Sequence, residues 1–230
     1  AYGDHTTVTV ADGTLNQGRI RMESADGGFS SNLSLAGVLT NGPTGVIDSQ
    51  VGAFGDRVIS GTLVNQGLVD ATANFITYYG TYEVAGGRVL GTVNFAGIAL
   101  RQTASPGELN VLRLMGTTTL ASDNLPNVEL WINGGGWLGD GVLTGLDGRE
   151  NRGIIRMEST DGGYPSVLSS GGTFVNGAAG LLQFNAGSGG PRRMDVSVDN
   201  RGTIRTELGQ FVDCDGTGRT FRQLGGSSEA

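Results

Sequence analysis

Apolar and polar residues alternate over short stretches of this chain, and each stretch begins just after a glycine. Residues 20–22 and residues 155–157 both read Ile-Arg-Met, so two apolar side chains flank a charged one. This two-residue period is typical of a β-strand with one face on a core. No long stretch has apolar residues at the three- and four-residue spacing of an amphipathic helix. The pattern therefore predicts an all-β protein of many short strands.

A motif of asparagine, glycine and an aliphatic residue recurs along the chain. Asparagine and glycine tolerate the positive φ of tight bends, so each motif indicates a bend followed by a strand. Stacked coils would place the aliphatic residues in one inward row, with the residues two positions later in a second. The six occurrences are Asn16–Gly18–Ile20, Asn41–Gly45–Ile47, Asn65–Gly67–Val69, Asn151–Gly153–Ile155, Asn176–Gly180–Leu182 and Asn200–Gly202–Ile204.

The chain also contains a duplication with an offset of 135 residues. Residues 16–28 and 151–163 are identical at ten of thirteen positions, and the same offset carries Asn41 to Asn176. In both halves the motif glycines are 27 and then 22 residues apart. Such agreement indicates two related sets of stacked coils.

These spacings together predict the fold class and its organisation. We expect a right-handed parallel β-solenoid (β-helix) of about 8–10 coils, because a coil takes roughly 24 residues and parallel crossovers are usually right-handed. Residues 1–230 are expected to form a single solenoid domain. Within it, a first repeat (7–89) and a second repeat (142–224) would be joined by coils 90–141.

The strand residue between the two inward rows should point outward. In the first repeat this row would be Arg21, Asp48 and Asp70, and in the second it would be Arg156, Gln183 and Arg205. A row of solvated side chains with weak surface ion pairs is one interpretation. The other is a site for carboxylate ligands made by Arg156 and Arg205.

Composition narrows the set of partners. The chain has 42 glycines, a formal charge of −7 and no lysine, so we expect no nucleic-acid partner. No apolar run is long enough for a membrane span, and we expect no membrane insertion. Cys214 is the only cysteine and His5 the only histidine. We expect Cys214 to be a buried thiol, and no disulfide or Cys/His metal site within the chain.

Two glycine-rich stretches carry a resemblance to a known class of proteins. Residues 134–144 read Gly-Gly-Gly-Trp-Leu-Gly-Asp-Gly-Val-Leu-Thr, and residues 86–93 read Gly-Gly-Arg-Val-Leu-Gly-Thr-Val. This rhythm resembles the repeats of bacterial surface β-helices, such as autotransporter passenger domains and filamentous-haemagglutinin-like adhesins. The resemblance implies secretion to the extracellular space or cell surface, and a role in adhesion or scaffolding. Pectin-lyase-like enzymes share the architecture, so the fold alone does not define the function.

Aromatic residues interrupt the repeat in two places. Tyr78, Tyr79 and Tyr82 would face the core or, if exposed, form a platform for sugar rings. Trp131 and Trp137 flank a run of glycines and would form a binding shelf or close the junction between the duplicated halves. All five are candidate ligand-binding residues, together with Arg156 and Arg205.

Catalytic and metal-binding chemistry has weaker support. Asp213 and Asp215 alternate as in a calcium loop, but the Glu of an EF-hand is missing, which leaves only a looser Ca²⁺ site between coils. We expect no other cofactor and assign no catalytic residue. Paired carboxylates for polysaccharide cleavage could come from Asp140, Asp147, Asp161 or Asp195, and the sequence selects no pair.

Three functions remain open at this stage. The leading one is a non-enzymatic structural or adhesive β-solenoid module of a bacterial surface or secreted protein. Its partners would be extracellular polysaccharide or protein, further solenoid coils, or other copies of the chain. The second is a polysaccharide-binding or polysaccharide-degrading β-helix. The third is an ice-binding solenoid, which needs an unbroken threonine row, whereas the expected row reads Thr14, Val38, Thr62, Val142, Thr173 and Val196.

Overall fold

The computed structural model describes residues 5–24, 28–52, 54–207, 212–214 and 218–229. It confirms the predicted fold class, because the chain is all-β and winds into a parallel β-solenoid of about nine turns. Among the described residues the one helical element is a 3-10 turn, η1 (Gly136–Leu138). The chain divides into two compact units, a first unit (1–110) and a second unit (111–230), which contain the first and second repeats respectively.

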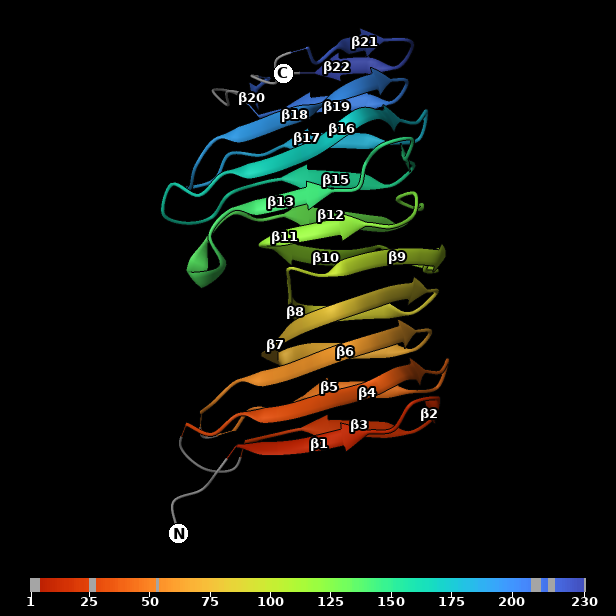
Figure 1. The fold of residues 1–230 in the computed structure, drawn as a ribbon, viewed down its shortest axis with the longest axis vertical. Coiled ribbons are helices and arrows are strands. Elements are labelled where there is room, and N and C mark those ends of the chain that lie inside the picture. The colour runs from red at the N-terminus through yellow and green to blue at the C-terminus, as the bar shows by residue number, and fades with distance from the viewer. Residues whose placement is uncertain (1–4, 25–27, 53, 208–211, 215–217, 230) are drawn as a thin grey trace. The chain divides into compact units, whose positions relative to one another are not determined.

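The first unit is a stack of parallel strands (Figure 1). Its strands are β1 (Thr6–Val10), β2 (Thr14–Asn16), β3 (Arg19–Met22), β4 (Ser31–Asn41), β5 (Val46–Ser49), β6 (Arg57–Asn65), β7 (Leu68–Ala85), β8 (Arg88–Ala96) and β9 (Ala99–Ala104). The second unit is built in the same way, with β10 (Asn110–Met115) beginning at the boundary. Its further strands are β11 (Thr117–Leu120), β12 (Val128–Ile132), β13 (Gly141–Thr144), β14 (Glu150–Asn151), β15 (Ile154–Met157), β16 (Ser166–Asn176), β17 (Leu181–Phe184), β18 (Arg192–Asn200), β19 (Thr203–Thr206), β20 (Val212–Asp213), β21 (Phe221–Gln223) and β22 (Ser227–Glu229).

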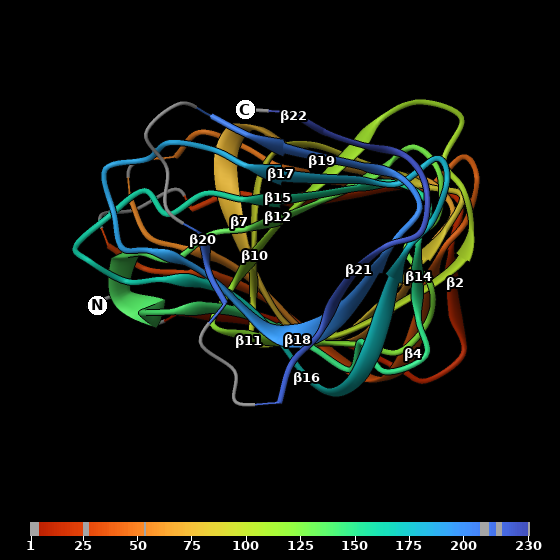
Figure 2. The same cartoon turned by 90° about the horizontal axis from the view of Figure 1, so that it is seen from above.

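Strands of successive coils lie over one another in each unit. In the second unit β12, β15, β17 and β19 form one side, and β16 and β18 form another (Figure 2). The predicted inward rows are confirmed: Ile20 pairs with Ile47 and Ile47 with Val69, while Ile155 pairs with Leu182 and Leu182 with Ile204. Ile47, Val69, Ile155 and Leu182 are all buried. The core is therefore a set of apolar rows along each stack.

The predicted outward rows have the expected register, but one of them is not a solvated row. Arg21, Asp48 and Asp70 pair in sequence, as do Arg156, Gln183 and Arg205. Asp48, however, is only 1% exposed. Its carboxylate accepts hydrogen bonds from Arg19 Nε and Nη2 at 2.6 and 2.8 Å, so its partner is Arg19 instead of Arg21. The Arg19 guanidinium covers the carboxylate and removes it from water.

The expected threonine row was aligned wrongly, apart from the pair Val38–Thr62. Thr14 pairs with Leu39, and Thr173 pairs with Ser197. β4 and β16 each contain an irregularity that shifts the pairing, at Ser34/Val38 and at Ser169/Thr173. An irregularity of this kind changes which residues of β4 and β16 face the following coil. It does not explain the position of Thr14, because β2 pairs with β4 without an irregularity.

Candidate functional site

The buried asparagines are the main polar feature of the first unit. Asn16 Nδ2 donates to Asn41 Oδ1 and Asn41 Nδ2 to Asn65 Oδ1, both at 2.8 Å. Asn65 Nδ2 donates at 2.9 Å to the hydroxyl of Tyr82, which ends this ladder. Each amide also donates to a backbone carbonyl of a following coil, as Asn41 does to Leu68. The motif asparagines thus link the coils through their side chains.

The second unit repeats this ladder with four asparagines. Asn124, Asn151, Asn176 and Asn200 donate in turn, with distances of 2.8, 2.8 and 2.7 Å, and Asn200 Nδ2 donates at 3.0 Å to Gln223 Oε1. All four asparagines are fully buried. A buried amide without partners is costly, so the ladder both satisfies these groups and fixes the register of the coils. At Gly180, a Cβ would clash with Asn176 Oδ1 and the Asn151 carbonyl oxygen, which explains the glycine of the motif.

A buried arginine is the second structural feature that the two repeats share. Arg57 and Arg192 are related by the 135-residue offset and are 0% and 2% exposed. Arg57 donates to the carbonyls of Gln50 and Gly55 at 2.7 and 2.5 Å, and Arg192 donates to that of Gly190 at 2.6 Å. Desolvation lowers the pKa of Arg192. These guanidiniums hold loop carbonyls and are structural groups.

The shared Arg-Met-Glu-Ser motif also has a structural role. Ser24 and Ser159 are buried, and their hydroxyls donate to the carbonyls of Phe29 and Tyr164 respectively. Ser159 is additionally within 3.0 Å of the Gly134 carbonyl in the preceding coil. The motif thus forms the same corner in both repeats.

Two of the three candidate tyrosines face the core, so the alternative of an exposed platform for sugar rings is wrong for them. Tyr78 and Tyr82 are each 1% exposed and pack with Phe95 at ring-centroid distances of 5.7 and 4.7 Å. The Tyr78 hydroxyl donates to the carbonyls of Gly61 and Thr81. Burial raises the pKa of both phenols. Tyr79, one position on, is half-buried on the opposite face, as the strand period requires.

Trp131 lies in a stack with two arginines in the second unit. The Arg156 guanidinium carbon is 4.1 Å from the indole centroid and that of Arg113 is 5.1 Å away. Arg156 also forms ion pairs with Glu129 at 2.6 Å and with Glu158 at 2.9 Å. A guanidinium over an aromatic face is attractive, and this one is also neutralised by carboxylates. The arrangement therefore uses Trp131 and Arg156 to hold neighbouring coils.

Arg205 lies on the same outward row as Arg156, with Gln183 between them. Its Nε is 3.2 Å from Glu229 Oε2. The structure thus brings Trp131 and Arg156 into contact and places Arg205 two coils further on. Because acidic partners accompany both arginines, the row does not have the uncompensated positive charge that a carboxylate site needs.

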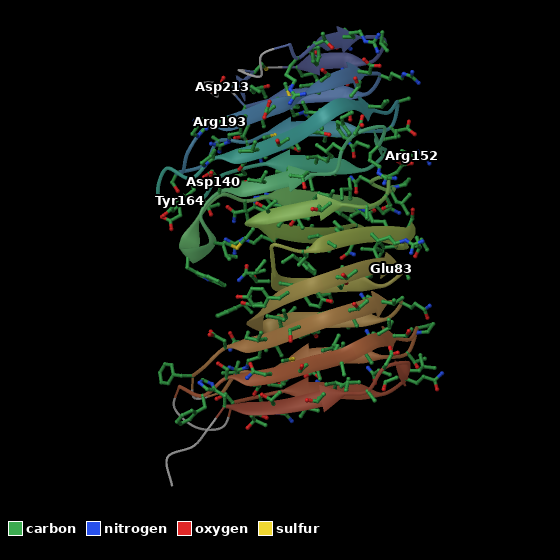
Figure 3. The ribbon with its side chains drawn as sticks, in the orientation of Figure 1. Glu83, Asp140, Arg152, Tyr164, Arg193 and Asp213 are labelled. Atoms are coloured by element: carbon green, nitrogen blue, oxygen red, sulfur yellow. The ribbon has the colours of Figure 1, made fainter. Side chains whose placement is uncertain are left out.

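Trp137 and Tyr164 form an exposed aromatic corner in the second unit. Trp137 lies on η1 and is 68% exposed, and Tyr164 is 41% exposed. Figure 3 shows Asp140 and Tyr164 near this turn. The Gly136 amide donates to Asp161 Oδ2 at 3.1 Å, which connects η1 to the loop that carries Tyr164. Trp137 is therefore on a projecting turn, separate from Trp131.

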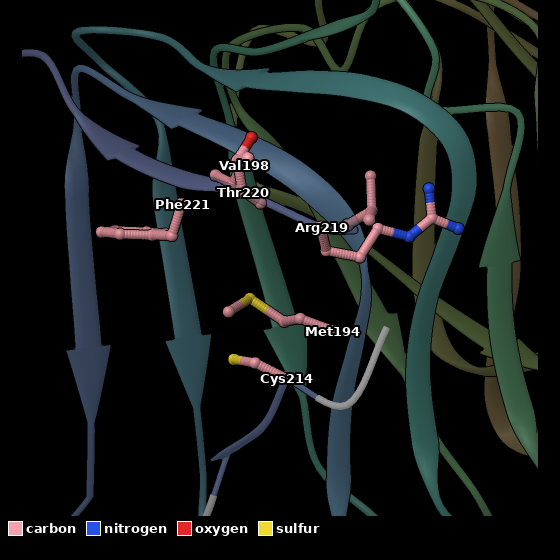
Figure 4. Close-up of a pocket in the computed structure, with 7 residues that line it drawn as sticks. Met194, Val198, Cys214, Arg219, Thr220 and Phe221 are labelled. Atoms are coloured by element: carbon pink, nitrogen blue, oxygen red, sulfur yellow. The ribbon is translucent and has the colours of Figure 1, made fainter. Parts of the chain in front are cut away.

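The last coils of the second unit surround a hollow of about 150 Å³. Its lining includes Met194, Cys214 and Phe221, and Figure 4 shows the two sulfur-bearing side chains next to each other. The prediction of a buried Cys214 is wrong, because the residue is exposed. Its pKa is raised, by partial burial and by Asp213. A thiol with a raised pKa is a weak nucleophile at neutral pH.

The calcium hypothesis falls partly outside the described residues, since Asp215 is not among them. Asp213 is 3.7 Å from Arg193 Nε. In the described part of the chain, no three His, Cys, Asp or Glu side chains are grouped so that they could hold a metal ion. Similarly, within the described ranges no helix is long and apolar enough to cross a membrane.

In comparisons with family models, with curated proteins and with solved structures, nothing matches this chain. The class of protein is therefore defined by the structure alone, as a parallel β-solenoid with an internal duplication.

Proposed function

We propose that this chain is a non-enzymatic structural or adhesive module of an extracellular bacterial surface protein. The main support is the use of its polar side chains. The asparagine ladders, the buried arginines and the Arg–Trp–Arg stack all connect one coil to the next. The asparagine ladder and the buried arginine occur in both repeats, as expected if selection maintains a stable stack of coils. The resemblance to autotransporter passenger domains and filamentous-haemagglutinin-like adhesins supports the extracellular location.

Two assays test this proposal: one for cleavage of polysaccharides by the chain, and one for display of the chain on the surface of intact cells. The purified chain is incubated with pectate, alginate and other polyuronates, and absorbance at 235 nm and reducing ends are followed. We expect no product. In parallel, the chain fused to an outer-membrane anchor and a terminal tag should keep the tag accessible on intact cells. Cleavage of any polyuronate would overturn the structural function.

A second candidate function is glycan binding at the aromatic corner of Trp137 and Tyr164. The observation in its favour is that a large indole is exposed on a turn, flanked by the exposed carboxylates of Asp140 and Asp161. Exposed aromatic groups commonly mark binding surfaces, and carboxylates accept hydrogen bonds from sugar hydroxyls. The Ca²⁺ site and the polysaccharide-degrading function have no comparable support.

A glycan array with wild type and Trp137→Ala tests this second candidate. If the corner binds glycans, the variant should lose roughly tenfold or more in affinity for each wild-type ligand. Leu224→Ala, which alters another exposed apolar side chain of the same unit, is the control. Equal binding by wild type and Trp137→Ala would exclude the corner as a glycan site.

A further inference from the structure

At one corner of the first unit the bends become shorter from coil to coil. The bend between β5 and β6 takes the seven residues 50–56. In the next coil the corresponding break in the pairing of β7 takes residues 72–75, and in the coil after that Thr92 alone corresponds to them. The long bend therefore projects beyond the two coils that follow it. The edge of this bend is called the first step.

The second unit has a step of the same kind, in which the long bend follows the short one. Gly116 alone separates β10 from β11, whereas the eight residues 133–140 separate β12 from β13 in the neighbouring coil. The longer bend contains η1 and packs over the end of β10, because a Cβ atom on Gly136 would lie 3.4 Å from Met115 Cε. The edge of this bend is called the second step.

Both steps carry an exposed aromatic side chain and an exposed aspartate. Phe54 is 76% exposed in the first step, and Trp137 is 68% exposed in the second. Asp56 and Asp140 are exposed and directly precede β6 and β13 respectively. Each aspartate is the only charged residue of its bend. The two steps therefore present the same pair of chemical groups.

The internal duplication does not explain this agreement. The 135-residue offset relates Phe54 to Gly189 and Asp56 to Pro191, and the whole bend 185–191 contains no aromatic and no charged residue. The equivalent bend of the second repeat thus lacks the pair that the first step has. Two bends that are not copies of each other carry the same exposed pair, which indicates a shared binding function.

An aromatic ring beside a carboxylate suits a sugar. The ring packs against the C–H groups of a pyranose, and the carboxylate accepts hydrogen bonds from its hydroxyls. In the first step Phe75 of the shorter coil adds apolar surface, since it is 39% exposed. Partial burial and the charge of Asp56 raise the pKa of Tyr79, so this carboxylate also lies close to the shorter coil.

The charge and the size of the steps narrow the ligand class. The long bends of both steps contain no basic residue, so their aspartates would repel uronates and sulfated sugars. A stable protein partner would cover roughly 800 Å² of this chain. Each step presents only one or two large apolar side chains, which suits a short segment of a polymer.

We propose that the two steps are separate binding sites for a neutral polysaccharide, one site in each unit. The inference rests on glycan binding at the corner of Trp137, which is the second candidate function above. It adds a second site at Phe54 and Asp56, and it assigns uncharged sugars as the ligand.

Retention on insoluble polymers tests the ligand class. The full chain is mixed with cellulose, chitin and mannan, and with a pectate gel as the acidic polymer. We expect retention on at least one neutral polymer and none on pectate, with no change when the salt concentration is raised, because no ion pair is formed. Retention on pectate, or on no neutral polymer, would overturn the inference. The second of these results would also exclude the glycan-binding candidate.

The number of sites tests whether both steps bind. Calorimetric titration with a hexasaccharide of the retained polymer should give two sites per chain. Phe54→Ala and Trp137→Ala should each leave one site, and the double variant should leave none. Leu109→Ala and Leu224→Ala remove exposed apolar side chains elsewhere in the two units and should leave both sites. Circular dichroism checks that every variant keeps its β-sheet signal.

The variants also separate this inference from the candidate function on which it rests. A single site that Trp137→Ala removes and Phe54→Ala leaves intact would overturn the inference while the corner of Trp137 stands. Sites that survive both substitutions would exclude the corner as well. Asp56→Asn and Asp140→Asn should each weaken the site of their own step roughly two- to tenfold, as expected for a weakened hydrogen bond. Weakening of both sites by one of these variants would contradict two separate sites.

Discussion

The two asparagine ladders are built alike and end differently. In the first unit the ladder has three asparagines and ends on the Tyr82 hydroxyl, whereas in the second it has four and ends on Gln223. An interior residue must donate to the next coil and accept from the previous one, and the amide side chain does both. A terminal residue has only to accept. The comparison shows that asparagine is required inside the ladder and is replaceable at its end.

The buried arginines differ in how well they are satisfied. Arg57 donates to loop carbonyls through both Nη1 and Nη2, and its Nε has no hydrogen-bond partner among the described residues. For Arg192 both Nε and Nη2 are without such a partner in the described part of the chain. The loops they hold differ as well, because Pro191 precedes Arg192 where Asp56 precedes Arg57. The same buried residue is thus better matched to its loop in the first unit.

The largest predicted effect separates interior from terminal ladder positions. Asn176→Ala should destabilise the fold by about 3–5 kcal/mol, because it leaves several buried groups unsatisfied, including the Thr203 carbonyl. Asn16→Ala should cost only ~1 kcal/mol, since Asn16 is half-buried. Urea unfolding followed by circular dichroism measures both. Equal effects would show that the ladder does not act as a chain of buried bonds.

The next effect compares the two arginines. Arg57→Met should cost about 2–4 kcal/mol, because it leaves at least two carbonyls without their donor. Arg192→Met should cost less, by about 1–2 kcal/mol, since fewer bonds are lost and two unsatisfied nitrogens are removed. The same unfolding assay gives the difference. A larger loss for Arg192→Met would reverse this comparison.

A smaller effect is expected at the end of the first ladder. Tyr82→Phe should destabilise the fold by about 1–2 kcal/mol, because Asn65 Nδ2 loses its acceptor while the aromatic packing remains. Tyr164→Phe, a matched change of an exposed tyrosine, should stay within about 0.5 kcal/mol. Thermal unfolding midpoints of the two variants make the test. If the two variants had the same unfolding midpoint, the Tyr82 hydroxyl would not stabilise the ladder as its terminal acceptor.

The smallest effect is the acid dependence that Asp48 contributes in the first unit. Hydrogen bonds from Arg19 hold the pKa of Asp48 below its usual range. This contribution to stability is present above the unfolded pKa of about 3.9 and is lost as the pH falls through the lower folded value. Asp48→Asn should therefore flatten the decline of the unfolding midpoint below pH 4. Gln183, the residue equivalent to Asp48 in the second repeat, has no such charge. An unchanged pH profile would exclude Asp48 as the source.

Much of the fold could be predicted from the chain because its inward rows repeat. Strand alternation and the 27-then-22 spacing placed Ile20, Ile47 and Val69 on one row, which the pairing confirms. The candidate binding residues were predicted less accurately than the fold. Whether Tyr78 or Tyr79 points inward depends on the phase of the pleat, and the irregularity within β7 changes that phase.

The sequence by itself determined the β-solenoid, its duplication and the position of the bends at the Asn–Gly motifs, because these depend on local periodicity. The reason expected for the motif residues was wrong, since none of the six motif glycines has a positive φ. Only the tertiary structure decided what the polar residues do. Asn41 and Asn65 were interpreted as bend residues and proved to be partners 24 residues apart. Asp48 pairs with Arg19 across 29 residues. Such contacts form between coils, so their geometry exists only once the coils are stacked.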